Sequence, residues 1–154
     1  MSKERFNVRV YGLIVNEQGE VLVSDEIIGG KAFTKFPGGG LEHGEGTISC
    51  LERECREEID REVEVLDHFY TTDFYQASSY SKSDQLISIY YHARLQDGWV
   101  LDTTEKPFDF PKQEEGAQVF RWISLSRLTE DQFQFPVDKR VAEMLRLAAV
   151  GKRN

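Results

Sequence analysis

Residues 38–58 read GGGLEHGEGTISCLERECREE, a stretch that contains five glycines and six glutamates. The glycines gather in its first half and predict a loop with little side chain of its own. After that loop, apolar residues recur at offsets of three and four, which predicts an amphipathic helix with Thr47 as its N-cap. The apolar stripe of this helix is formed by Ile48, Leu51, Cys55 and Ile59.

Three glutamates of the predicted helix, Glu54, Glu57 and Glu58, share one arc beside this stripe. A solvated face supported by i,i+4 pairs such as Arg53 with Glu57 is the usual interpretation of a helix rich in Glu and Arg. Glu54 and Glu58 are themselves an i,i+4 pair of like charges, which repel unless a cation neutralises them or one binds a proton. We therefore favour a divalent-cation site over an ordinary charged surface.

The glycines complement this interpretation. Hard cations such as Mg²⁺ take oxygen ligands and retain waters, so carboxylates and phosphate oxygens together form a suitable shell. Gly38, Gly39 and Gly40 can bring main-chain carbonyls to a metal or amides to a phosphate, close to the start of a helix. The stretch predicts that a metal and a pyrophosphate meet at this helix.

The same residues resemble the Nudix box, GX5EX7REUXEEXGU, in which U is a bulky aliphatic residue. Its diagnostic places are filled here by Gly39, Glu45, Arg53, Glu54, Glu57 and Glu58. The far end departs from the box, because Asp60 replaces the last glycine and Arg61 an aliphatic residue, while Cys55 fills the other U position. Asp tolerates the left-handed backbone common just past a helix, so we expect this departure to affect the turn more than the glutamates.

The flanking sequence is also similar to that family, with FPGG before the box and VFRWISLSRL late in the chain. The resemblance implies an α/β (α+β) fold, a Nudix-type α/β/α sandwich with a mixed sheet. It also implies a hydrolase dependent on Mg²⁺ or Mn²⁺ that cleaves the pyrophosphate bond of a nucleoside diphosphate linked to another moiety, by in-line attack of an activated water. Nucleoside triphosphates, ADP-ribose, nucleotide sugars and dinucleoside polyphosphates all remain open as substrates.

The resemblance also assigns roles to single residues. The metal ligands that it implies are the carbonyl of Gly38 and the carboxylates of Glu54, Glu57 and Glu58. Arg53 would orient the glutamates, and Glu45 would brace the loop or Arg53; the plainer alternatives are a surface partner of Glu57 and a first-turn residue. Glu57 is the first choice for the catalytic base.

Other acids and several aromatic residues extend this candidate site. Glu114 and Glu115, in the loop before the late Trp-bearing strand, are alternative bases, and Glu105 is a weaker one. Gly39 and Gly40 are candidates for contact with substrate. A base could stack on an aromatic ring near a loop end, and the candidates are Phe33, Phe36, Tyr75, Tyr80, Phe108 and Phe110. For any one of these rings core packing is the commoner role; Phe36 is the one that we place at the substrate.

The rest of the chain predicts strands on both sides of this helix and a second helix at the end. Phe6–Val15 and Val21–Val23, separated by the turn signal Asn16–Gly19, predict a hairpin. Further strands are expected at 32–36, 63–76, 85–95 and 117–123, with 63–76 and 85–95 as antiparallel neighbours. The final helix is expected to begin at Pro136, to stop at Gly151 and to pack on the sheet.

Composition limits the function further. The 154 residues, 40% hydrophobic, predict a single domain over 1–154. The net charge of −8 argues against binding to nucleic acid, and the sequence has neither a membrane span nor a signal peptide, so we expect a cytoplasmic protein. Cys50 and Cys55 are interpreted as reduced thiols that fill space. A homodimer is compatible with the apolar strand content.

Two alternatives to the enzyme stay open. One is a module of the same fold that senses a nucleotide without cleaving it, for which Asp60 and Arg61 leave room although the REXXEE core is intact. The other is a structural domain with an ordinary charged helix, which would bind no metal.

Overall fold

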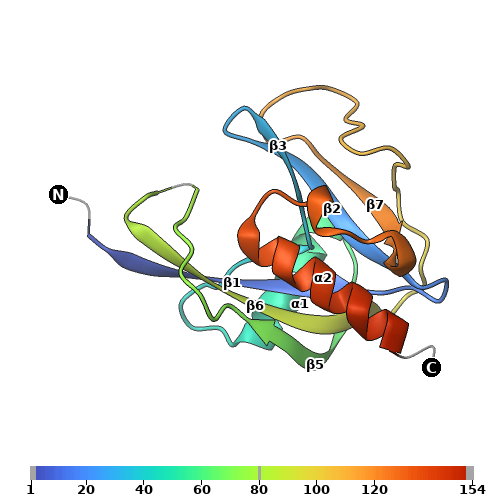
Figure 1. Cartoon of the computed structure of the whole chain (residues 1–154), viewed down its shortest axis with the longest axis horizontal. Coiled ribbons are helices and arrows are strands. Elements are labelled where there is room, and N and C mark those ends of the chain that lie inside the picture. Colours follow the sequence, from blue (N-terminus) through green and yellow to red (C-terminus); the bar gives the residue numbers. More distant parts are fainter. Residues whose placement is uncertain (1–2, 80, 152–154) are drawn as a thin grey trace. The chain divides into compact units, whose positions relative to one another are not determined.

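The structure of the chain, a computed structural model, describes residues 3–79 and 81–151 (Figure 1). Its contacts divide into two compact units, each built from two separate pieces of chain. The first unit comprises the residues up to Leu13 together with Pro37–Gly98, and the second comprises Ile14–Phe36 together with the residues from Trp99 onward. Tyr80, one of the candidate stacking rings, lies outside the described residues.

The first unit contains a four-stranded sheet and one helix. The strands lie in the order β4 (Gly38–Gly40), β1 (Arg5–Ile14), β6 (Asp84–Leu95) and β5 (Val63–Thr71). As predicted, β5 and β6 are antiparallel neighbours, although β5 ends at Thr71 and does not reach Gln76. The helix α1 (Thr47–Ile59) packs on β4 and β5, which places the glutamates of the box beside the glycine strand.

The second unit contains a three-stranded antiparallel sheet in the order β3 (Lys31–Lys35), β2 (Glu20–Ile28) and β7 (Gln118–Ser124). Strands β2 and β3 are joined by Gly29 and Gly30, whose φ angles of 62° and 76° suit the tight two-residue turn of a hairpin. Two 3₁₀ turns follow β7, namely η1 (Leu125–Arg127) and η2 (Glu130–Gln132), and they pack against α2 (Pro136–Gly151).

The predicted hairpin of the first two strands is wrong. The turn itself forms, because the side-chain oxygen of Asn16 accepts hydrogen bonds from the amides of Gln18 and Glu20, and Gly19 has a φ of 74°. Beyond a single bridge between Val15 and Val21, the two strands do not pair. Both edges of β1 are taken by β4 and β6, and both edges of β2 by β3 and β7. The turn therefore carries the chain from one sheet into the other.

The final helix begins at Pro136 as predicted. Val137, Val141 and Leu145 of its predicted stripe are buried, together with Ala142 and Asp138, whereas Ala148 is exposed. The segment before the helix packs on β3 and on the residue that follows it. Phe133 stacks on Phe36 with ring centroids 5.0 Å apart, and Phe135 stacks on Phe33 at 4.6 Å.

Candidate active site

The glycine triplet forms a short strand and not the loop that the sequence predicted. Gly38, Gly39 and Gly40 pair antiparallel with Tyr11, Val10 and Arg9 of β1. Gly38 has a φ of 147°, and a Cβ placed there would lie 2.1 Å from the carbonyl oxygen of Val10. Residue 38 must therefore be glycine for β4 to lie this close to β1.

Gly39 allows the strand to contact the helix. A Cβ at this residue would lie 2.5 Å from the carboxyl carbon of Glu54, so the backbone of β4 occupies the space beside that carboxylate. A Cβ at Gly40 would meet only the end of the Arg9 side chain, at 3.7 Å. Of these two glycines, Gly39 alone is required by its contact with a glutamate of the box.

Helix α1 differs from the prediction in its first turn. Its N-cap is Gly46, and Thr47 is already helical, with a hydroxyl 2.7 Å from that of Tyr91 on β6. Leu51 and Cys55 are buried as predicted, but Cys50 takes the place that the periodicity gave to Ile48, whose exposed fraction is 48%. Burial raises the pKa of Cys50 and of Cys55 to about 12, and both thiols are free, in agreement with the prediction.

The end of α1 shows the turn that the sequence left in question at Asp60. This residue is the C-cap of the helix and lies in the left-handed region, with φ 53° and ψ 44°. A glycine would adopt the same backbone more easily, but Asp is one of the residues that tolerate it. The departure from the box therefore leaves a helix end of the usual shape.

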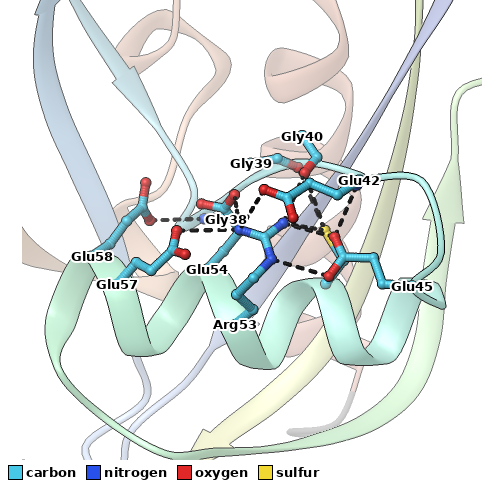
Figure 2. Close-up of polar contacts among 10 residues, drawn as sticks. Gly38, Gly39, Gly40, Glu42, Glu45, Arg53, Glu54, Glu57 and Glu58 are labelled. Atoms are coloured by element: carbon cyan, nitrogen blue, oxygen red, sulfur yellow. Dashed lines mark hydrogen bonds and ion pairs between the residues drawn. The ribbon is translucent and has the colours of Figure 1, made fainter.

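Arg53 connects both ends of the acidic cluster, which we define as Glu42, Glu45, Glu54, Glu57 and Glu58 (Figure 2). Its Nε and Nη2 atoms donate to the two carboxylate oxygens of Glu45, at 3.0 and 2.7 Å. Its Nη1 atom donates to Glu54 Oε1 at 3.0 Å and to Glu57 Oε2 at 3.2 Å. Nη2 also donates to the carbonyl of Gly40 at 3.1 Å. One guanidinium thus fixes carboxylates from the loop and from the helix relative to β4.

The ion pair with Glu45 is the shortest that Arg53 makes with the glutamates of the cluster, at 2.7 Å. The hydrogen bonds from Arg53 lower the pKa of Glu45 to about 2, and the pKa of Arg53 is raised in turn by its hydrogen bond with Glu45. The amide of Glu42 donates to Glu45 Oε1 at 2.9 Å, which closes the loop before the helix. These contacts support the bracing role that the resemblance implies for Glu45.

The other end of the cluster lies against Gly38. The amide of Gly38 donates to Glu58 Oε2 at 3.1 Å, and Figure 2 shows Glu57 and Glu58 at the end of the cluster away from Glu45. The Glu57 side chain is 59% exposed, whereas that of Glu54 is 15% exposed. The structure thus brings together Gly38, Glu54, Glu57 and Glu58, the four residues that the resemblance names as metal ligands.

Whether these residues fit a divalent cation can be judged from their oxygen atoms. Among residues 3–79 and 81–151, no three acidic, histidine or cysteine side chains are arranged as the ligands of one ion. The donor set is nevertheless of the kind that Mg²⁺ prefers, since it offers carboxylate and carbonyl oxygens only. Arg53 contacts one oxygen each of Glu54 and Glu57, which leaves Glu54 Oε2 and Glu57 Oε1 outside its hydrogen bonds. The residues fit the cation in their chemistry.

The alternative bases and Phe36 lie in the second unit, whereas Tyr75 lies in the first. Both carboxylate oxygens of Glu115 accept hydrogen bonds from the amides of Gly29 and Gly30, at 2.8 and 2.9 Å. Glu114 forms an exposed ion pair with Lys112 at 3.5 Å. Phe36 is 1% exposed and stacks on Phe133, so the prediction that its ring contacts substrate is corrected: the ring belongs to the core.

Sequence reasoning missed two members of this network. Glu42 lies 3.7 Å from Arg53 Nη1, and the thiol of Cys50 donates to the carbonyl of Gly40 at 3.5 Å. A signal for Glu42 was its place three residues before Glu45, the spacing at which a short loop can fold back on itself. No comparable signal marked Cys50, because its role depends on where β4 lies.

The whole of this architecture matches one protein family. Residues 5–146 match the model of the NUDIX domain. The chain belongs to the Nudix family. Members of this family are hydrolases that act on nucleotide-type small molecules and generally need divalent metals. No curated protein matches the chain.

Solved structures show the same fold as this Nudix chain. The solution structure of the E. coli ORF135 protein is 22% identical, with a TM-score of 0.65 and coverage of 95% of this chain and 93% of that one. The MutT protein from Methanosarcina mazei Go1 is 19% identical, with a TM-score of 0.67 and coverage of 97% and 99%. An ADP-ribose pyrophosphatase from Streptococcus suis 89-1591 is 17% identical, with a TM-score of 0.59 and coverage of 96% and 92%. The predicted α+β Nudix fold with a mixed sheet is confirmed.

None of the helices that the structure describes combines the length and the apolar character needed to cross a membrane.

Proposed function

We propose that this Nudix chain is a pyrophosphohydrolase, dependent on Mg²⁺ or Mn²⁺, that cleaves a nucleoside diphosphate linked to another moiety. The observation that carries this proposal is the arrangement of carboxylates around Arg53. Glu54 and Glu57 share its Nη1 atom, and Glu58 is held on the amide of Gly38. Like charges gathered this closely, with oxygen atoms left over, suit a substrate that arrives with divalent cations.

Gly38, Glu54, Glu57 and Glu58 would hold the cation. A bound Mg²⁺ or Mn²⁺ supplies positive charge that offsets the charge of the diphosphate and favours deprotonation of water. The protein residues then have separate tasks. Arg53 and Glu45 keep Glu54 and Glu57 in place through the hydrogen bonds described above, and β4 supplies a backbone that approaches the substrate without side chains in the way.

Glu57 is the base that we propose. Its side chain is 59% exposed, against 15% for that of Glu54, and Glu58 is only partly exposed. A base must reach a water on the open side of the site, which suits the more exposed carboxylate. Glu115 is the weaker alternative, since both its oxygens are already hydrogen bonded to Gly29 and Gly30. The reaction adds water across one phosphoanhydride bond and gives two products, each of which ends in a phosphate group at the cleaved position.

The test is turnover of a panel of nucleoside diphosphate derivatives with Mg²⁺ or Mn²⁺, measured as release of phosphate monoester. Glu57→Gln should reduce kcat by about 100-fold or more. Glu52→Gln is the matched control, because it removes a glutamate of the same helix outside the acidic cluster, and it should leave kcat within about twofold. Metal-dependent binding of a nucleotide without turnover of any substrate would instead favour the sensor, and neither binding nor turnover would favour the structural domain.

A further inference from the structure

Two neighbouring cavities of the first unit lie beside the start of β1. One has a volume of about 510 Å³ and is lined by Phe6, Tyr75, Lys82 and neighbouring residues. The other, of about 420 Å³, is lined by Leu41, Glu42 and His43 of the box loop. Both are also lined by Arg5, Phe6 and Asp84, so they adjoin, and we call the two cavities together the β1 groove. Either volume lies in the range of known small-molecule sites.

The outer part of the β1 groove exposes two aromatic rings. Phe6 is 69% exposed and Tyr75 is 68% exposed, although residues of this size usually bury most of their surface when nothing binds them. Both rings line the same cavity. Exposed rings beside a cavity provide surfaces on which an aromatic heterocycle can stack.

The charges of the groove indicate what kind of aromatic ligand fits. Arg5 forms a fork with Asp84, through Nε and Nη2 to the two carboxylate oxygens at 3.3 and 3.4 Å. Lys82 makes no ion pair with a residue that the structure describes. With Glu4 and Glu42 also in its walls, the groove carries mixed charge, and among its described residues Lys82 is the one cation outside an ion pair. It therefore suits a neutral base and its sugar with one phosphate, and it does not suit a bare polyphosphate.

The inner part of the groove ends at the acidic cluster. Glu42, in its wall, donates its amide to Glu45 Oε1 at 2.9 Å, and its carboxylate lies 3.7 Å from Arg53 Nη1. Arg53 Nη1 is also the atom that contacts Glu54 and Glu57. A ligand with phosphates at the acidic cluster can thus extend past Glu42 and His43 towards Phe6 and Tyr75.

We propose that the β1 groove binds the second nucleoside of a substrate in which two nucleosides are joined through phosphates, with Phe6 and Tyr75 stacking on its base. This inference rests on the proposed function, since it assumes that the diphosphate is cleaved at the acidic cluster. It adds a substrate class, because a dinucleotide-type molecule places an aromatic base at each end. Substrates without a second base would leave the two rings unused.

Binding can be tested apart from catalysis. Adenosine 5′-monophosphate is titrated into the protein in EDTA, where phosphate binding by the acidic cluster is not supported by a cation, and heteronuclear NMR follows the amides of β1 and of residues 75–79. We expect saturable shifts with adenosine 5′-monophosphate but none with ribose 5-phosphate. Phe6→Ala and Tyr75→Ala should each weaken binding by about tenfold, from the usual contribution of one base–ring stack.

Leu66→Ala is the matched control, since it removes an apolar side chain of the same unit that is 40% exposed and lines neither cavity. It should leave the affinity unchanged. The proposal is overturned if adenosine 5′-monophosphate does not bind in EDTA, or if Phe6→Ala and Tyr75→Ala bind it as tightly as Leu66→Ala does.

Measurements of turnover on two substrates distinguish a failure of this proposal from a failure of the proposed function. Diadenosine diphosphate and ADP-ribose share one adenosine diphosphate half and differ in the second base. Phe6→Ala should lower kcat/KM for diadenosine diphosphate by about tenfold and leave that for ADP-ribose unchanged. An equal effect on both substrates would contradict the β1 groove as a base site. Loss of turnover alone, with the binding of adenosine 5′-monophosphate retained, would contradict the proposed function and not the groove.

Discussion

Gly39 lies so close to Glu54 that a Cβ on residue 39 would sit 2.5 Å from the carboxyl carbon of that glutamate. The box thus requires glycine at a place where the backbone of one element meets the functional group of another. This relationship explains why a glycine more than a dozen residues away along the chain belongs to the same site as the helix glutamates.

Gly39→Ala should separate folding from activity. The added methyl group meets the end of a flexible side chain, so Glu54 can move and the protein should still fold, with a melting temperature within a few degrees of wild type. The displaced carboxylate should reduce kcat by roughly 10- to 100-fold. Gly40→Ala is the control from the same strand, since its Cβ would be in ordinary contact with Arg9. Equal activities of the two variants would contradict the role of the Gly39 contact.

Gly38→Ala should act on stability instead. Its Cβ would lie 2.1 Å from the backbone oxygen of Val10, and its φ of 147° disfavours any side chain. Because backbone must move, we expect the free energy of unfolding to fall by about 2–4 kcal/mol. Urea denaturation followed by circular dichroism measures this change, and a loss no larger than that of Gly40→Ala would argue that β4 is not held against β1 as described.

Arg53→Lys tests the fork geometry separately from the charge. Lysine keeps the positive charge but cannot make the paired bonds to Glu45 while also contacting Glu54 and Glu57. We expect kcat to fall by roughly 10- to 100-fold with KM much less affected. Arg56→Lys changes an exposed arginine of the same helix, paired with Glu62, and should have no effect. Steady-state kinetics of both variants decide between the positioning role and a general charge effect.

The low pKa of Glu45 predicts a dependence of stability on pH. Arg53 lowers the folded-state pKa of Glu45 to about 2, below its ordinary value of 4.5. The carboxylate therefore contributes its stability fully above about pH 4.5 and loses it as the pH falls towards 2. The difference in unfolding free energy between wild type and Glu45→Gln should be constant from pH 5 to 7 and should shrink below that range.

Urea titrations at a series of pH values measure this difference. Glu143→Gln controls for the loss of one negative charge from a helix surface. If the difference in unfolding free energy between wild type and Glu45→Gln were the same at pH 5 and at pH 2.5, the hydrogen bonds between Arg53 and Glu45 would not be the cause of that difference.

The buried ion pair between Asp25 and Arg121, in the second unit, should contribute strongly to the stability of the protein, although it lies far from the box in sequence. Asp25 is fully buried and accepts hydrogen bonds from Arg121, from the hydroxyl of Thr34 and from the amide of Phe108. Asp25→Ala would leave the guanidinium buried without its partner, which should lower the unfolding free energy by about 3–5 kcal/mol. Glu64→Ala breaks the exposed pair with Arg94 and should cost less than about 1 kcal/mol. Comparable losses in both variants would contradict the importance of burial.

Much of this fold could be predicted from local pattern. The alternating strands, the helix of the box and the start of the final helix depend on neighbouring residues, and they lie near the predicted ranges. The sequence also indicated that Asp60 tolerates the left-handed backbone that it adopts, because this tolerance belongs to the residue itself.

The errors concern long-range partners. The hairpin signal at Asn16–Gly19 specified a turn correctly, but it could not show that β1 and β2 each find other neighbours. The glycine triplet read as a loop because glycine has low strand propensity, whereas pairing with Val10 makes it a strand. Ile48 and Phe36 were misplaced for a related reason, since periodicity and position do not reveal which side chains other elements cover.

The split of each unit into two pieces of chain has a consequence for biosynthesis. The last strand of the first unit, β6, has been synthesised once the ribosome passes Leu95. In the second unit, β2 and β3 are synthesised early, but their sheet is complete only after β7, which begins at Gln118. At ordinary rates of translation, roughly several seconds pass between the synthesis of β3 and that of β7. During this time the edge of β2 that later pairs with β7 is unpaired in the nascent polypeptide. The emerging protein is therefore most prone to aggregation after α1 has been made and before the sheet of the second unit is complete.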